Sequence, residues 1–319
     1  MSVQVTRRNF LKASVAGSTA AGMAMSFEEQ ALLAYQSQPP DQSVAAKARQ
    51  PLPTGKLGKV SVSRLICGGN LISGFAHSRD LIYVSPLMMR YFTDAKVFET
   101  LQLCEANGIN TTILRLDENT LRLLKAYWKD HDGKIQWIAQ ISITENEMAA
   151  QIRQAADNGA VGAFTHGGVG DDLFKKGKID VLGKAVELIK KQGLAAGIAG
   201  HALEVPKACE KAGIKPDFYM KTFNSKRYWS AGLAPRNDSV WEETPQETMA
   251  FMEEVEVPWI AYKVLGAGAI HPREGFQYAF QNGADFLCAG MFDFQVAEDA
   301  EFARSALEKN RLRNRPWSV

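Results

Sequence analysis

Apolar runs of strand length alternate with amphipathic stretches of helical length over most of this 319-residue chain. Within the amphipathic stretches, apolar residues recur at helical spacing, as at 182, 185, 186 and 189. Glycines stand where helical stretches give way to the next apolar run, as expected at helix ends. The expected strands are residues 64–69, 110–116, 135–143, 160–166, 194–201, 217–223, 259–268 and 284–292.

The regular alternation of expected strands and helices predicts the fold class. Strands that are apolar throughout are typical of a parallel sheet covered on both faces. Eight such units within roughly 250 residues favour a closed (β/α)8 TIM barrel over an open doubly wound sheet. The absence of a G-x-G-x-x-G sequence after the first strand argues in the same direction. Functional residues are then expected at the carboxyl ends of the strands and in the loops that follow them.

The first 53 residues differ from the rest of the chain. TRRNFLK, Thr6 to Lys12, precedes a mildly apolar run that is too short to span a membrane. The segment resembles the twin-arginine export signal of bacteria. This resemblance implies a signal peptide at 1–26, the twin-arginine translocase as a partner during export, and a periplasmic or secreted mature protein. Residues 27–53 are polar and contain several prolines and glutamines, so we expect a linker there and the barrel at 54–319.

The amino-acid composition and the net charge argue against some classes of function. Hydrophobic residues make up 46% of the chain and the formal net charge is +2, as in an ordinary globular protein. Basic residues form no stripe interleaved with aromatic residues, which argues against a nucleic-acid-binding protein. The four cysteines lie far apart in apolar surroundings and are expected to be buried and free.

Two histidines end neighbouring expected strands. His166 and His201 follow the fourth and fifth apolar runs. They could transfer protons, orient other groups by hydrogen bonds, or bind a metal ion together with Asp117 or Asp293. Because no H-x-H or H-E-x-x-H spacing is present, no metal site is expected.

Lys221 lies inside FYMKTF, an apolar run in which a charged amine is unfavourable unless it is paired or used. Lys263 lies on the next expected strand. Two neighbouring ammonium groups would lower each other's pKa and leave one amine able to form a Schiff base. MKTFN loosely resembles the sixth-strand lysine segment of Schiff-base aldolases. The alternatives are an ion pair with a carboxylate such as Asp293, or contact with an anionic ligand.

Two loops carry further candidate residues. Gly266 and Gly268 in LGAGAI allow a phosphate to approach the backbone before a helix. The segment 224–243 carries Tyr228, Trp229 and Trp241, which suit stacking on a sugar or another flat polar substrate. A loop packed only for stability is the alternative for that segment.

TGKLGKVSVSRLICGGN at 54–70 resembles the opening of aldo/keto reductases. The likeness continues through TDAKVFETLQLCEANGIN, GAFTHGG, AVELIKKQGLAAGIAGH, WIAYKVLGAGAI and GMFDFQVAEDA, and so covers about residues 54 to 308. The resemblance implies a (β/α)8 barrel preceded by a β-hairpin. It also implies carbonyl chemistry with a nicotinamide dinucleotide, NAD(P).

The catalytic residues of this family are mostly absent. Its histidine corresponds to His166, whereas its aspartate position holds Ile113 and its lysine position falls at Gln140 or Ile141. DENTL stands where its tyrosine is expected. The cofactor contacts implied by the resemblance are Tyr262, Lys263, Gly266, Gly268, Met291 and Gln295. Asp293 stands near the position that usually holds the 2′-phosphate of NADPH, so a carboxylate there favours NAD or, as an equal alternative, no dinucleotide at all.

The sequence therefore gives one main interpretation and two alternatives. The main interpretation is an exported aldo/keto reductase-like oxidoreductase with a rebuilt site, acting on a small carbonyl or sugar-derived substrate. His166, Lys221 and His201 would carry proton transfer, with Lys221 in place of the missing tyrosine. The alternatives are a cofactor-independent Schiff-base lyase using Lys221 and Lys263, and a ligand-binding barrel without catalysis.

Overall fold

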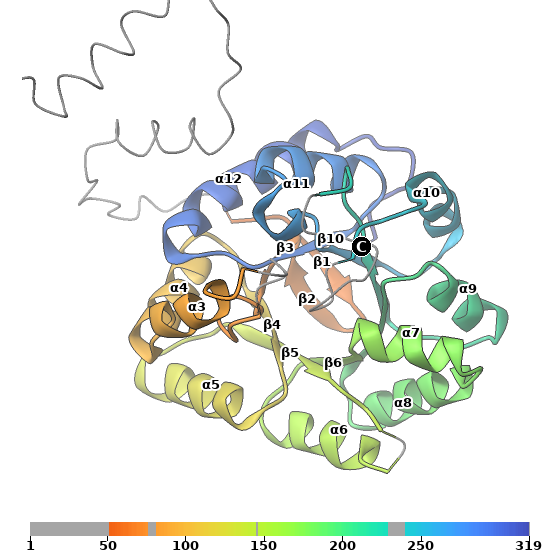
Figure 1. The fold of residues 1–319 in the computed structure, drawn as a ribbon, viewed down its shortest axis with the longest axis horizontal. Helices are drawn as coiled ribbons and strands as arrows, with labels where there is room; N and C mark the ends of the chain where they lie inside the picture. The colour runs from red at the N-terminus through yellow and green to blue at the C-terminus, as the bar shows by residue number, and fades with distance from the viewer. Residues whose placement is uncertain (1–50, 76–80, 145, 229–239, 319) are drawn as a thin grey trace, which may run out of the picture. The chain divides into compact units, whose positions relative to one another are not determined.

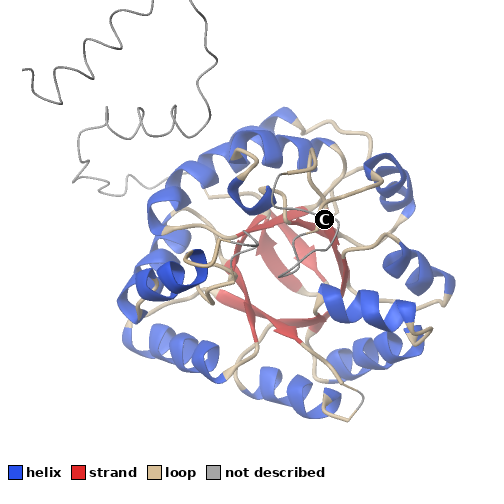
Figure 2. Cartoon of the chain, in the orientation of Figure 1, coloured by secondary structure: helices blue, strands red, loops and turns tan. Residues whose placement is uncertain are grey.

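The centre of the molecule is a closed barrel of eight parallel strands, in the order β10–β3–β4–β5–β6–β7–β8–β9. The computed structural model describes residues 51–75, 81–144, 146–228 and 240–318. The expected signal peptide and most of the expected linker lie outside the described residues. Helices form an outer ring around the strands (Figure 2). The (β/α)8 barrel predicted from the apolar pattern is thus confirmed, together with an N-terminal hairpin of two antiparallel strands.

The elements follow one another in regular alternation (Figure 1). The strands are β1 Thr54–Leu57, β2 Val60–Ser63, β3 Leu65–Gly68, β4 Thr111–Arg115, β5 Gln136–Ile141, β6 Gly162–Thr165, β7 Ala195–Gly200, β8 Phe218–Thr222, β9 Trp259–Tyr262 and β10 Phe286–Ala289. The helices are α3 Val84–Tyr91, α4 Asp94–Ala106, α5 Glu118–Asp130, α6 Met148–Asp157, α7 Gly167–Lys175, α8 Ile179–Lys191, α9 Glu204–Lys211, α10 Pro245–Glu254, α11 Pro272–Gln281 and α12 Asp293–Lys309, with a 3₁₀ turn at Gly266–Gly268.

The observed strands are shorter than the expected ones, most of all at β9. The expected strand ran over 259–268, but β9 ends at Tyr262. Lys263 has a φ of 58°, in the left-handed region, and this turns the chain out of the sheet. The residues that follow therefore form a turn above the barrel rather than a continued strand.

Two apolar layers hold the barrel together. The inner layer fills the barrel and includes Ile66, Ile113, Ile138, Phe164, Phe218, Met220, Ile260 and Phe286. The hairpin adds Leu57 and Val62, both fully buried, to this layer and so closes one end of the barrel. The outer layer lies between strands and helices and includes Trp137, Tyr219 and Trp259. Each such side chain contributes about 1.5–3 kcal/mol by its burial.

Alternation along β8 decides which way Lys221 points. Phe218 and Met220 belong to the inner layer, and Tyr219 belongs to the outer layer. Because successive side chains of a strand point to opposite faces, Lys221 shares the outer face with Tyr219. The ammonium group therefore lies outside the barrel interior.

A buried ion cluster fixes the C-terminal tail. The fully buried Asp285 accepts hydrogen bonds from Arg313 at 2.9 Å, from Arg315, and from the backbone N–H of Ser318 at 3.0 Å. Arg64, just before β3, lies 3.9 Å from the same carboxylate and donates to the carbonyl of Ser318 at 2.6 Å. One carboxylate thus joins the tail to the starts of two strands. Among the described residues, no helix is long and apolar enough to cross a membrane.

Candidate functional site

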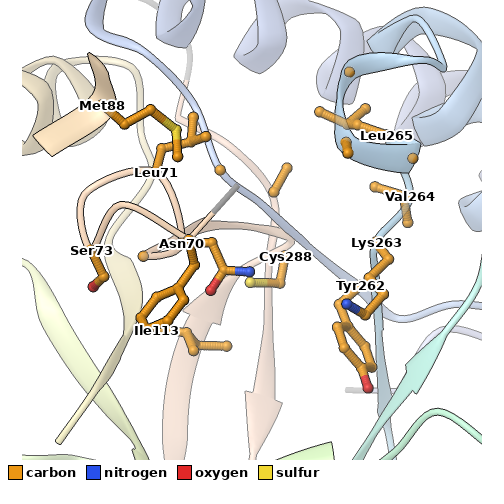
Figure 3. Close-up of a pocket in the computed structure, with 18 of the residues that line it drawn as sticks. Asn70, Leu71, Ser73, Met88, Ile113, Tyr262, Lys263, Val264, Leu265 and Cys288 are labelled. Carbon is orange, nitrogen blue, oxygen red and sulfur yellow. The ribbon is translucent and has the colours of Figure 1, made fainter. Parts of the chain in front are cut away.

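A cavity of about 360 Å³ opens at the carboxyl ends of the strands. Its lining comes from the ends of β3, β4, β9 and β10, the loop after β3, helix α3 and the turn after β9. Figure 3 shows Leu71 and Met88 on one side of this cavity, Val264 and Leu265 on the other, and Asn70, Cys288 and Tyr262 closer to the strands. The position matches the rule that barrels hold ligands at this end.

The polar part of the lining is basic. Arg115 and Lys263 are its charged side chains, and none of the described residues that line the cavity is acidic. The Nε atom of Arg115 lies 3.1 Å from a carboxylate oxygen of Asp117, and this leaves the rest of the guanidinium group for other contacts. The ammonium group of Lys263 lies 5.8 Å from the ring centroid of Tyr262. A lining of this charge favours an anionic ligand.

The turn after β9 brings backbone close to the cavity. Lys263, Gly266, Ala267 and Gly268 have φ values of 58°, 52°, 55° and 89°. The N–H groups of Gly266 and Gly268 donate to the carbonyl oxygens of Lys263 and Leu265 at 3.0 and 2.9 Å, so the turn is held by its own hydrogen bonds. A Cβ placed on Gly268 would meet no described atom within 4 Å, so this backbone is open to a ligand. Gly266 is enclosed instead, because its Cβ would lie 2.8 Å from the Tyr228 ring.

Tyr262 connects the cavity with the two histidines. Its ring lines the cavity, and its hydroxyl group lies beside Gly167, where an added Cβ would come within 2.5 Å of the oxygen. The ring centroids of Tyr262 and His201 are 5.6 Å apart, and those of His201 and His166 are 6.4 Å apart. The two histidines and the tyrosine therefore form one group at the barrel mouth.

Asp171 orients His201. Its Oδ2 lies 2.6 Å from Nδ1 of the His201 ring, while its Oδ1 accepts the backbone N–H groups of His201 and Ala202 at 2.9 and 3.1 Å. A carboxylate at Nδ1 holds a proton there and leaves Nε2 as the ring nitrogen that can exchange one. His166 has a different task, because its Nδ1 accepts the N–H of Gly168 at 3.2 Å and caps α7.

Lys221 has three acceptors. Its ammonium group donates to the carbonyl oxygens of His201 and Thr222 at 2.6 and 3.0 Å, and to a carboxylate oxygen of Glu242. The side chains of Lys221 and Glu242 are 1% and 3% exposed. Burial lowers the pKa of Lys221, and the charge of Glu242 opposes that shift. Geometry of this kind indicates a structural ion pair rather than a nucleophile.

The ion pair is linked to the cavity through Asn224. The Oδ1 of Asn224 accepts the backbone N–H of Glu242 at 3.1 Å, and its Nδ2 donates to the carbonyl oxygen of Lys263 at 3.3 Å. The buried pair thereby supports the residue whose ammonium group faces the cavity.

The residues expected from the sequence divide into two groups. Those that line the cavity are Tyr262, Lys263, Gly266, Gly268 and Gln295. Those that lie outside its lining are His166, His201, Lys221 and Met291. Asp293 bonds to Tyr91 and lies 3.0 Å from the ammonium group of Lys96, which neutralises its charge. No cluster of three potential metal-binding side chains occurs in the described part of the chain.

Sequence reasoning missed the two carboxylates that matter most here. Asp171 lies in the first turns of α7, five residues after His166, and reaches the end of the next strand. Glu242 follows Lys221 by 21 residues. Because no local pattern encodes either contact, only the folded barrel brings these pairs together.

Comparison with known proteins supports the fold. No protein-family profile matches the sequence, and no curated protein is significantly similar to it. A predicted aldo-keto reductase from Pseudomonas aeruginosa has a similar solved structure, with a TM-score of 0.55 and 17% identity over 82% of this chain and 99% of that chain. A truncated 3-deoxy-D-arabino-heptulosonate 7-phosphate synthase from Thermotoga maritima has a TM-score of 0.52 and 10% identity, covering 82% and 95%. The chain thus shares its barrel fold with aldo-keto reductases and with this synthase.

Proposed function

We propose that the protein is an aldo/keto reductase-like oxidoreductase that binds a nicotinamide dinucleotide at the barrel mouth and acts on a small carbonyl or sugar-derived compound. The observation that carries this proposal is the lining of the cavity. Two cations and no described carboxylate face the cavity, together with the ring of Tyr262 and the open turn at Gly268.

The residues present suit such a cofactor. A dinucleotide carries two negative charges on its pyrophosphate, and the ammonium group of Lys263 would offset part of this charge. The ring of Tyr262 offers a flat surface for a flat heterocycle. When bound, the nicotinamide would supply or accept a hydride. Because Lys96 neutralises Asp293, this carboxylate presents no uncompensated charge to a 2′-phosphate.

Replacing Lys263 with alanine should weaken dinucleotide binding about 10- to 100-fold, since a hydrogen bond to a charged group contributes about 1.5–3 kcal/mol. The measurement is a fluorescence titration of the purified protein with NADH and with NADPH. Lys184→Ala is the control, because Lys184 is exposed on α8 and pairs with Asp180. If the unaltered protein shows no saturable binding of either dinucleotide, hydride transfer is excluded.

We assign proton transfer to His201, which Asp171 orients and whose ring centroid lies 5.6 Å from that of Tyr262 in the cavity lining. Replacing Asp171 with asparagine should lower kcat by about 100-fold or more, because the ring would lose the group that sets its proton. The dissociation constant of the dinucleotide should stay unchanged. Asp172→Asn is the matched control. Asp172 follows Asp171 directly, is exposed, and among the contacts described pairs only with Lys176. Equal losses in both variants would contradict the assignment.

The Schiff-base alternative is weaker, because the amine of Lys221 lies outside the cavity lining and holds three acceptors. Lys263 lines the cavity and is therefore the remaining candidate for a Schiff-base lysine. Borohydride treatment with a carbonyl compound, followed by mass measurement, would reveal a trapped adduct on Lys263. Ligand binding without any turnover would instead favour a non-catalytic barrel.

Export belongs to the same proposal. It rests on TRRNFLK near the N-terminus, which lies outside the described residues. Replacing both Arg7 and Arg8 with lysine should keep the protein in the cytoplasmic fraction if the twin-arginine route exports it.

A further inference from the structure

Large apolar side chains that are exposed gather at one place on the described surface. Eight such side chains stand out by their exposure, and seven of them lie on the segment 75–91 or at the start of α12. The seven are Phe75, Ile82, Tyr83, Leu87, Met89, Tyr91 and Phe294, which we call the apolar rim. The eighth, Leu312, lies in the C-terminal tail. Scattered exposed apolar residues need no explanation, but a contiguous group indicates a binding surface.

The apolar rim is continuous with the cavity through α3. Val84 and Met88 line the cavity, and Leu87 neighbours Val84 on the helix surface at i+3. Leu87 is nevertheless 57% exposed. On the other side of the helix, Met89 packs against Gly74. A Cβ added to Gly74 would lie 2.5 Å from the sulfur atom of Met89. Figure 3 shows Met88 reaching toward Leu71 at the cavity wall.

A second connection runs through stacked aromatic rings. Phe292 lines the cavity and stacks on Phe294 with centroids 5.3 Å apart and an interplanar angle of 10°. Phe294 is 67% exposed. Tyr91 meets the edge of Phe292 at 5.4 Å. Apolar surface therefore passes from inside the cavity to solvent along these rings, and the ion pair of Lys96 and Asp293 borders it at Tyr91.

The basic groups of the cavity lining lie beside this surface. Arg115 and Lys263 line the cavity, and the Arg115 guanidinium lies over the ring of Phe75 at 5.0 Å. A ligand with one anionic or strongly polar end and a hydrocarbon portion matches both parts. The polar end would lie near Arg115, with Lys263 left to the dinucleotide, and the hydrocarbon would leave the cavity across the rim.

We propose that the substrate is an amphiphile whose apolar portion lies on the apolar rim. The position of the site rests on the proposed function, but the binding itself requires no redox reaction. A lipid surface or a second copy of the chain could cover an apolar patch. Neither would require that patch to continue into a cavity lined by cations.

The test uses sodium butyrate, octanoate and dodecanoate as probes, titrated by calorimetry below their micelle concentrations. Affinity should rise with chain length, by up to about fourfold for each methylene that becomes buried. Leu87→Asp and Phe294→Asp should both flatten this dependence. Leu312→Asp, at a fully exposed residue away from the rim, should leave it unchanged. Because the three residues are exposed, unchanged thermal unfolding should confirm that each variant is folded.

An affinity that is independent of chain length would overturn the inference, as would an equal dependence in all variants. Dimers of the unaltered protein that Leu87→Asp dissociates, without any dependence on chain length, would identify a second copy as the occupant and also overturn it. Titration of the same proteins with NADPH separates this result from the proposed function. Chain-length dependence without dinucleotide binding would retain the amphiphile and exclude the oxidoreductase, and the reverse result would exclude only the amphiphile.

Discussion

Replacing Asp285 with alanine is expected to lower the free energy of unfolding by about 3–5 kcal/mol, a large share of the total stability of a typical domain. The carboxylate is fully buried among the guanidinium groups of Arg64, Arg313 and Arg315. Without it, three cations would remain in a poorly solvated site without their shared counter-ion. The backbone N–H of Trp259, which donates to Asp285 at 3.1 Å, would lose its acceptor as well. Chemical denaturation measures the effect.

Asp217 is the matched control for this prediction. Like Asp285, it directly precedes a strand segment and accepts the backbone N–H of a neighbouring strand, here from Ala196 at 2.8 Å. Its ion pair with Lys190 at 3.1 Å is partly exposed, however, with side-chain exposures of 23% and 40%. Asp217→Ala should therefore destabilise by about 1–2 kcal/mol. Equal losses at the two positions would show that the buried arginines do not depend on Asp285.

The barrel could be predicted from the sequence because its signal is repeated and local. Apolar strands between amphipathic helices specify a parallel sheet, and eight repeats specify closure. The end of β9 could not be predicted, because the apolar run continues past Tyr262 while Lys263 adopts a left-handed backbone conformation. A run of apolar residues indicates that a segment is buried, but it does not indicate where the backbone leaves the sheet.

Part of the cavity lining could also be predicted from the sequence. Alignment with the aldo/keto reductase pattern selected Tyr262, Lys263 and Gly268, which line the cavity. The side of β8 on which Lys221 lies was not predictable, because a strand buried on both faces carries no alternation that distinguishes inside from outside. The apolar rim was also hidden, since residues such as Leu87 and Phe294 have the composition of core positions and only the fold leaves them exposed.

The most informative test of the site concerns the pair Lys221 and Glu242. Replacing Lys221 alone with methionine should lower the free energy of unfolding by about 3–5 kcal/mol, because the carboxylate of Glu242 would stay buried without its cation. Replacing both, as Lys221→Met with Glu242→Leu, should bring stability back to within about 1–2 kcal/mol of the unaltered protein, since a buried ion pair is often replaceable by apolar side chains of similar volume. Denaturation of the three proteins measures this recovery.

The double variant also separates structure from chemistry. If the ion pair only supports Asn224 and the backbone of Lys263, the double variant should bind NADPH or NADH within a few-fold of the unaltered protein and retain turnover. If Lys221 donates a proton or forms a Schiff base, the double variant would be stable and would bind ligand, yet turnover would be lost. A stable, inactive double variant would therefore return Lys221 to the catalytic residues. A stable, active one would establish that its charge serves the fold, because no amine would remain at position 221 to carry the reaction.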